Sequence, residues 1–213
     1  MIIWGYIITA FCFVLTFLLA ITVYKIAKHN EISRKIIHIV AGVGWLVFWF
    51  FFQDTIHPFI ISLVFVIVTV ITNVKQVKFV ELEKSNYGTV FFTASMAIMA
   101  LLSYIYPSYL FSFGVAIVSL SIGDGMASII GEHANFMPKK LFGNKTLVGT
   151  VACTFFTFVA IVGINCICGT QLNILNIIIL SAITGLVELF SGKYDNITIP
   201  FCAFFLSHMM IYG

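Results

Sequence analysis

Long apolar runs alternate with short polar gaps in this chain, and lysine and arginine occur only in every second gap. These residues are Lys25, Lys28, Arg34 and Lys35 in the first gap, Lys75, Lys78 and Lys84 in the third, Lys139, Lys140 and Lys145 in the fifth, and Lys193 in the seventh. Positively charged loops stay on the cytoplasmic side of a membrane, so the alternation predicts a topology as well as a class of protein. We expect a multi-pass integral membrane protein whose basic gaps, and most of whose carboxylates, face the cytoplasm.

The apolar runs are long enough to cross a bilayer, whose hydrocarbon core of about 30 Å needs roughly 20 residues of helix. They predict helices near 2–24, 36–52, 56–72, 88–104, 109–130, 147–168, 174–190 and 197–212. The last run is short, so seven and eight spans both stay open. With 61% hydrophobic and 9% charged residues, the fold class is all-α, a single transmembrane domain over residues 1–213. The net charge of +3 is explained by the loops and gives no reason to expect nucleic acid as a partner. A homo-oligomer stays open.

The first polar constellation is Glu31, Arg34, Lys35 and His38. Their spacing of i, i+3, i+4 and i+7 places them on one face of a helix. A basic flank that extends toward the headgroups, with Glu31 paired to Lys35, would account for the first three residues. His38 lies inside the apolar run, where an ionisable side chain is costly and indicates a functional site.

The second constellation is Asp124 between Gly123 and Gly125, near the inner end of the predicted helix 109–130. Glycines allow the backbone to bend and a ligand to approach closely. Packing of small residues, such as Gly123 against a neighbouring helix, would explain the glycines but not the carboxylate. An aspartate at this depth suits Mg²⁺ or the proton of an alcohol better than it suits packing.

The third constellation is the loop 131–146, rich in glycine and lysine, which leads into the predicted helix 147–168. The N–H groups at a helix N-terminus favour a phosphate, Lys145 adds a positive charge, and Thr146 could cap the helix or contact the phosphate. The Walker A pattern is absent, and an ordinary cytoplasmic loop is the alternative interpretation.

The fourth constellation is Glu188, within an apolar run, followed by Asp195 and Asn196. An ionisable residue at such a position again indicates a site, whereas Asp195 and Asn196 alone would be typical of a turn. Carboxylates, a histidine, hydroxyls and basic residues at one membrane face together suit a Mg²⁺-nucleotide and phosphoryl transfer. The acceptor would come from the lipid bilayer, because apolar helices surround the site.

At these positions the chain resembles the CTP-dependent lipid-alcohol kinases, which include dolichol kinase, phytol kinase and the CTP-dependent diacylglycerol kinase and are distantly related to phosphatidate cytidylyltransferase. The matching motifs are Glu31-x-x-Arg34-Lys35-x-x-His38, Gly123-Asp124-Gly125-x-Ala127-x-x-x-Gly131, Lys145-Thr146-x-x-Gly149-Thr150, and Glu188 followed by Asp195-Asn196 and Pro200. They occur in the family's order across most of the chain, and a phytol-kinase-like or polyprenol-type member is the nearer comparison.

The resemblance implies CTP as phosphate donor, Mg²⁺ as the divalent metal, and a membrane isoprenoid alcohol as acceptor at the cytoplasmic face. Carried onto this chain, the catalytic residues are Asp124, His38 and Glu188; the nucleotide-binding residues are Arg34, Lys35, Gly123, Gly125, Lys145, Thr146, Gly149 and Asn196; and the metal ligands are Asp124, Asp195 and Glu31. A cytidylyltransferase that makes CDP-diacylglycerol is the alternative within enzymes. A transporter fits less well, because the charged residues gather at one side and no path across the membrane is visible.

Overall fold

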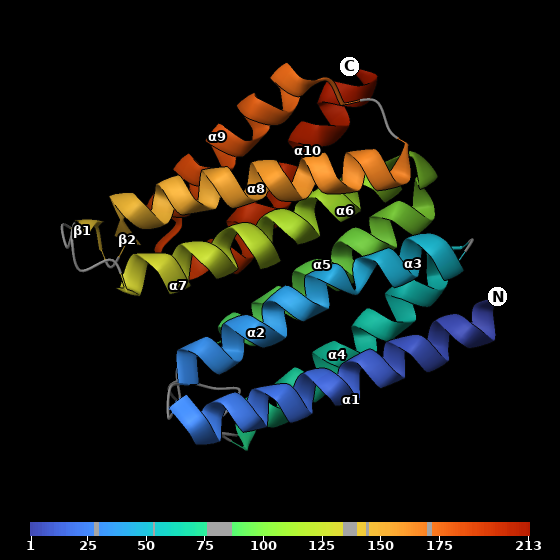
Figure 1. The fold of residues 1–213 in the computed structure, drawn as a ribbon. Helices are drawn as coiled ribbons and strands as arrows, with labels where there is room; N and C mark the ends of the chain where they lie inside the picture. Colours follow the sequence, from blue (N-terminus) through green and yellow to red (C-terminus); the bar gives the residue numbers. More distant parts are fainter. Residues whose placement is uncertain (28–29, 53, 76–86, 134–139, 144, 170–171) are drawn as a thin grey trace. The chain divides into compact units, whose positions relative to one another are not determined.

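A computed structural model describes residues 1–213 except 28–29, 53, 76–86, 134–139, 144 and 170–171, and the side chains of Glu31 and Arg34 also lie outside the described part. Helices dominate the described residues, as the all-α prediction required (Figure 1). The chain divides into two compact units, Met1–Leu110 and Phe111–Gly213, which are considered separately below. The prediction of a single domain stays a prediction.

The first unit consists of membrane-length and shorter apolar helices. Its elements are α1 (Ile2–Ala27), α2 (Asn30–Val43), α3 (Trp45–Phe51), α4 (Ile56–Val74), α5 (Gly88–Ile105) and the 3-10 turn η1 (Pro107–Tyr109). Helix α1 packs against α2 and α3, and α4 packs along α5. Ring contacts join the two pairs, because Phe13 of α1 stacks on Phe65 of α4 at 5.1 Å between ring centroids, and His38 of α2 stacks on Phe92 of α5 at 4.3 Å. The unit therefore holds together through aromatic packing between helix pairs.

The helix predicted near 36–52 is two helices, α2 and α3, which meet at Gly44. The backbone N–H of Gly44 still donates to the carbonyl of Val40 at 2.9 Å. A Cβ atom at this glycine would lie only 3.1 Å from the carbonyl oxygen of Ala41, so the absence of a side chain permits the close backbone approach. Gly44 lies within an apolar run and does not change its hydrophobic pattern. The sequence therefore predicted one helix where the structure has two.

The second unit is a bundle around a π-helical turn. Its elements are α6 (Leu110–Val118), the π-helical η2 (Ser119–Asp124), α7 (Gly125–His133), β1 (Lys140–Phe142), β2 (Lys145–Thr146), α8 (Leu147–Cys168), α9 (Ile174–Ser191), the 3-10 turn η3 (Gly192–Tyr194) and α10 (Asp195–Tyr212). Helix α8 packs between α7 and α9, α10 packs on α9, and η2 contacts α8, α9 and α10. Every long helix of the bundle therefore reaches the segment that ends at Asp124.

A two-stranded hairpin precedes α8, which an all-α prediction did not include. Strands β1 and β2 pair antiparallel, with Lys140 opposite Thr146 and Phe142 opposite Lys145. The turn between them uses Gly143 at a φ of 55°, a backbone conformation that glycine adopts without steric cost. The Phe142 ring packs edge-to-face on Phe190 of α9 at 5.2 Å, which holds the hairpin against the bundle.

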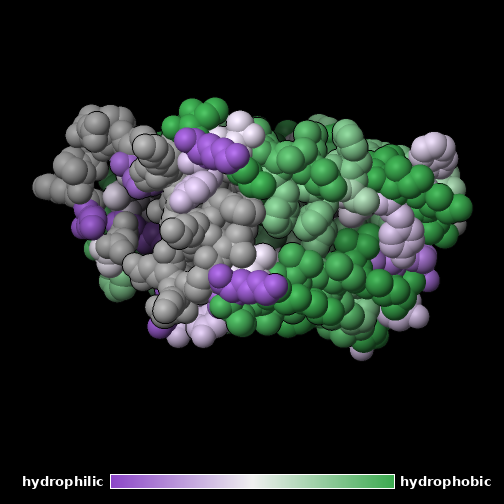
Figure 2. Space-filling model, turned by 90° about the horizontal axis from the view of Figure 1, so that it is seen from below, coloured by the Kyte–Doolittle hydropathy of each residue, from purple (hydrophilic) through white to green (hydrophobic). Residues whose placement is uncertain are grey.

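Among the described residues, six helical segments are long and apolar enough to cross a membrane. They are Ile2–Ile26, Ile56–Val74, Gly88–Ile105, Pro107–Glu132, Leu147–Cys168 and Ile174–Tyr212, and a shorter apolar helical stretch, Lys35–Phe51, contains part of α2 and all of α3. The last segment contains α9, η3 and α10, which the sequence predicted as two spans. Figure 2 shows that hydrophobic residues form a broad surface on the face seen there, with the most hydrophilic residues toward its margins. A surface of this kind suits a hydrocarbon environment.

Candidate functional site

The ammonium group of Lys145 lies among three carboxylates in the second unit. Its Nζ atom is 2.8 Å from Oε1 of Glu188, 3.0 Å from Oδ2 of Asp195 and 3.6 Å from Oδ1 of Asp124. The second, third and fourth constellations of the sequence thus contribute to one cluster. We call these four residues the Lys145 cluster.

Asp124 is the most deeply buried member, with 1% of its side chain exposed. It is the last residue of η2, where the helical hydrogen-bond pattern widens to a π-turn. The hydroxyls of Ser119 and Ser121 donate to the carbonyls of Val115 and Ile117, one turn before them. Such hydroxyl donors satisfy carbonyls where the regular pattern changes, and π-turns occur frequently at functional sites. The distortion and the carboxylate therefore coincide in the same six-residue segment.

Glu188 is oriented by a hydrogen bond from the neighbouring helix. The Thr150 hydroxyl of α8 donates to its Oε2 at 3.1 Å, while Oε1 faces Lys145. Both oxygens of this buried carboxylate are therefore engaged. Close approach of α8 and α9 makes the bond possible, because a Cβ atom at Gly185 would lie 3.2 Å from the carbonyl oxygen of Thr150.

Lys145 and Thr146 are positioned by the start of α8. Thr146 is the N-cap of this helix, and its Oγ1 accepts a hydrogen bond of 3.0 Å from the backbone N–H of Gly149. Gly131 of α7 lies close by, since a Cβ atom there would be 2.8 Å from the same oxygen and 3.2 Å from Cα of Gly149. Two glycines thus let α7 approach the N-terminus of α8, where Lys145 enters the cluster.

The three carboxylates of the cluster set the electrostatic environment of Lys145. Burial alone lowers the pKa of Lys145, but the charges of Asp124, Asp195 and Glu188 outweigh burial and raise the pKa above its ordinary value of 10.5. The lysine is therefore a fixed cation at neutral pH and cannot act as a general base. The ammonium of Lys145 thus approaches three carboxylates in a largely buried place.

The predicted metal ligands are only partly placed by the structure. Asp124 and Asp195 both reach the Lys145 cluster, whereas the side chain of Glu31 lies outside the described part. Among the residues that the structure describes, no group of three or more His, Cys, Asp or Glu side chains is arranged to hold a metal ion. The carboxylates converge on an ammonium instead, and the metal assignment stays a prediction.

The remaining predicted residues fall into two groups. Gly123 and Gly125 flank Asp124, Gly149 follows the helix cap, and Asn196, which is 3% exposed, is the second residue of α10, after Asp195. Lys35 and His38 belong to the first unit, where both are buried in α2, at 3% and 2% exposure. The side chain of Arg34, like that of Glu31, lies outside the described part. The structure therefore supports a shared location for the second-unit residues only.

Sequence reasoning missed the supporting hydroxyls. Thr150 orients Glu188, and Thr154 donates to the carbonyl of Thr150 at 3.1 Å, which continues the line of threonines from Thr146 along α8. Their spacing of four residues places them on one helix face, which the sequence could have indicated. The Glu188 carboxylate that accepts from Thr150 lies on another helix, and residue spacing along the sequence does not predict that contact.

Comparisons of the chain with protein-family models, with curated proteins and with solved structures give no match. The resemblance to lipid-alcohol kinases therefore rests on the four motifs of the sequence.

Proposed function

We propose that the protein is a CTP-dependent kinase that phosphorylates the hydroxyl of a membrane isoprenoid alcohol of the phytol, polyprenol or dolichol type. The observation that carries the proposal is the Lys145 cluster, in which residues from three separate motifs meet although Lys145 and Asp195, for example, are 50 residues apart in the sequence. Burying carboxylates and an ammonium costs free energy of desolvation. Such a buried cluster therefore indicates a functional site. Helices long and apolar enough for a membrane surround it, which suits an acceptor supplied by the bilayer.

In the proposed reaction the alcohol oxygen forms a bond to the γ-phosphorus of CTP. The bond from that phosphorus to the β–γ bridging oxygen breaks, which releases CDP. Positioning and charge neutralisation contribute most to phosphoryl transfer. Lys145 binds a phosphate oxygen of CTP near the N-terminus of α8, and Glu188, oriented by Thr150, keeps the ammonium in place.

Mg²⁺ fits the donor set of the cluster. Carboxylate oxygens are ligands that it prefers, and those of Asp124 and Asp195 both lie beside Lys145. Asp124 and Asp195 would hold the ion, which would neutralise phosphate charge when bound. Two roles fit Asp124, a ligand of this ion or the acceptor of the hydroxyl proton. The predicted contributions of His38, Lys35, Arg34 and Glu31 complete the proposal from the sequence.

The basic gaps support a site at the cytoplasmic face, where CTP is supplied. Lys140 and Lys145 belong to one basic gap, and Lys193 belongs to the next along the chain. The positive-inside preference assigns both gaps to the cytoplasm. A multi-pass protein with this orientation receives the nucleotide from solution and the alcohol from the membrane.

The test is transfer of ³²P from γ-labelled CTP to a panel of lipid alcohols by the purified protein, with ATP as control donor. We expect Asp124→Asn to lower turnover by roughly 100-fold or more, because a base or metal ligand contributes at least that much. The matched control is Glu132→Gln, an exposed carboxylate of α7, which should retain turnover within about twofold.

Titration of Mg²⁺ separates the two roles of Asp124. If Asp124 holds the ion, Asp124→Asn should regain part of its turnover at high Mg²⁺; if it accepts the proton, turnover stays low at every concentration. The released nucleotide separates the alternatives, because a kinase releases CDP whereas a cytidylyltransferase releases pyrophosphate. Labelled lipid formed equally from ATP, or normal turnover in folded Asp124→Asn, would contradict the proposal.

A further inference from the structure

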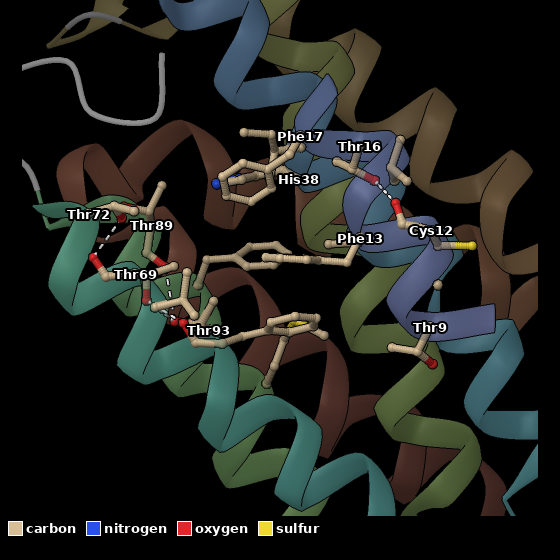
Figure 3. A pocket seen from close by; sticks show the side chains of 18 of the residues that line it. Thr9, Cys12, Phe13, Thr16, Phe17, His38, Thr69, Thr72, Thr89 and Thr93 are labelled. Carbon is tan, nitrogen blue, oxygen red and sulfur yellow. Dashed lines mark hydrogen bonds between the residues drawn. The ribbon is translucent and has the colours of Figure 1, made fainter. Parts of the chain in front are cut away.

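The first unit contains a partly open pocket of about 100 Å³, which His38 lines together with residues to which the proposed function gives no role. All five α-helices of the unit, α1 to α5, contribute side chains to it. Figure 3 shows His38 and Phe17 at one end and Thr9 toward the other, with Phe13 between them. The pocket is therefore an elongated slot between helices that are apolar on their outer faces.

Three of the threonines in the walls of the slot use their hydroxyls within the protein. The hydroxyls of Thr16 and Thr69 donate to backbone carbonyls of their own helices, at 2.6 Å and 2.9 Å. Thr69 and Thr93 also share a hydrogen bond of 2.8 Å across α4 and α5. Their hydrogen-bonding capacity is thus used within the protein. Apolar cavities stay dry and accept apolar ligands, so water is a poor occupant of this slot.

One end of the slot differs from the rest by carrying an imidazole. His38 is 2% exposed and stacks on Phe92, and Thr72 and Thr89 line the slot with it. From His38 to Phe48, which also lines the slot, α2 and α3 advance about ten residues, or roughly 15 Å at 1.5 Å per residue. A ligand with one polar end and a long apolar chain matches this distribution.

We propose that this slot binds the hydrocarbon chain of a single-chain lipid alcohol, with the hydroxyl at the His38 end and the chain directed toward Phe48. A second helix is excluded as occupant, because a helix with side chains is about 10 Å wide or more. A cavity of about 150 Å³ accepts one benzene ring, so 100 Å³ holds a segment of one chain rather than two chains side by side. The inference rests on the proposed function only in identifying the bound alcohol as the phosphate acceptor.

The probe is farnesol with a photoreactive diazirine at the end remote from the hydroxyl. The full-length protein is reconstituted in phosphatidylcholine nanodiscs without CTP, illuminated, and mapped by peptide mass spectrometry. The orientation predicts modification near Phe48 and Met96, which line the slot away from His38, and little near Ile37. Modification spread evenly over the exposed lipid-facing side chains, or concentrated near Ile37, would overturn the proposal.

Competition identifies the chemistry that the slot recognises. Unlabelled farnesol and oleyl alcohol should each reduce modification, and the stronger competitor shows whether a branched or a straight chain is preferred. The matching hydrocarbon without the hydroxyl should compete roughly threefold to tenfold more weakly, which corresponds to one hydrogen bond. The variant His38→Phe keeps a ring for stacking on Phe92 and should abolish that difference. Equal competition by alcohol and hydrocarbon in the unsubstituted protein would overturn the placement of the hydroxyl.

A filling variant tests the slot itself. Ala41 lines it, and Ala41→Phe should reduce modification at least fivefold, whereas Val43→Phe, at an exposed position of the same helix, should leave it within twofold. The farnesol competition in the unsubstituted protein keeps the proposal testable if Ala41→Phe does not fold. If the protein transfers phosphate but the probe modifies no residue of the slot, the slot proposal is overturned and the proposed function is not. If farnesol competes with modification of the slot but the protein transfers no phosphate, the proposed function is overturned and the slot proposal is not.

Discussion

Replacing Lys145 with methionine removes a positive charge that lies within 4 Å of carboxylate oxygens of Asp124, Glu188 and Asp195. Methionine keeps most of the length and apolar stem of the lysine side chain, so packing changes little. The carboxylates then lose this ion-pair partner, and two of them, Asp124 and Glu188, are almost completely buried, at 1% and 4% side-chain exposure. We expect Lys145→Met to destabilise the protein as well as to impair catalysis.

The magnitude follows from the burial of the ion pairs. Removing one partner of a buried pair typically costs about 3–5 kcal/mol, because it leaves an uncompensated charge. For a chain of about this length, 1 kcal/mol corresponds to roughly 2–4 °C in melting temperature. The expected fall is therefore about 6–20 °C at pH 7. Lys145 itself is 18% exposed, so the lower half of this range is the better expectation.

Fluorescence-detected size-exclusion chromatography after heating in detergent measures the effect. The matched control is Lys140→Met, which removes an exposed lysine from the preceding strand of the same hairpin and should shift the melting temperature by less than about 2 °C. Adding Glu188→Gln to Lys145→Met removes one uncompensated charge and should restore part of the loss. The reasoning is refuted if Lys145→Met melts within 2 °C of the unsubstituted protein, or if Lys140→Met is equally destabilised.

Three further predictions use the same structure. The raised pKa of Lys145 places the loss of its stabilising charge above its ordinary value of 10.5, so the difference in melting temperature between the unsubstituted protein and Lys145→Met should stay constant from pH 7 to pH 10; a decline over that range would contradict the charge assignment. Gly131→Ala should cost about 1–3 kcal/mol, because the new Cβ would lie 2.8 Å from the hydroxyl oxygen of the α8 N-cap, whereas Gly163→Ala meets no atom within 4 Å and should be neutral or stabilising in the same melting assay. With native cysteines replaced, an impermeant maleimide added outside cells should label Asp54→Cys and not Lys140→Cys, and labelling of the latter would overturn the cytoplasmic site.

The sequence indicated the helices well because their signals are local. Thr146 marks a helix start through its capping side chain, and α8 begins at Leu147, as predicted. The apolar run that predicts residues 2–24 continues in the structure to Ala27, because helix ends carry weaker signals than helix interiors. The hairpin was missed, since β1 and β2 have only a few residues and no alternating pattern long enough to detect.

Each of the four residues of the Lys145 cluster was a predicted site residue, but their mutual contacts were not predicted. Lys145 was interpreted as a phosphate ligand from its place before a helix, and the structure adds three carboxylate partners. Glu188 and Asp195 are far from it along the chain, and their approach depends on how α8, α9 and α10 pack. No local pattern encodes that packing. Motif order along the sequence therefore supports a common site, while only tertiary structure supplies the pairing.

The π-turn at Ser119–Asp124 makes the geometry of the site depend on the number of residues in this segment. A π-turn accommodates one residue more than the α-helical repeat, which advances the angular phase of everything after it by about 100°. Deleting one residue from this segment would restore a regular helix from α6 into α7 and turn the face that carries Gly131 away from α8. The angle at which α7 meets the start of α8 is thus set by a residue count, independently of any side chain in the cluster.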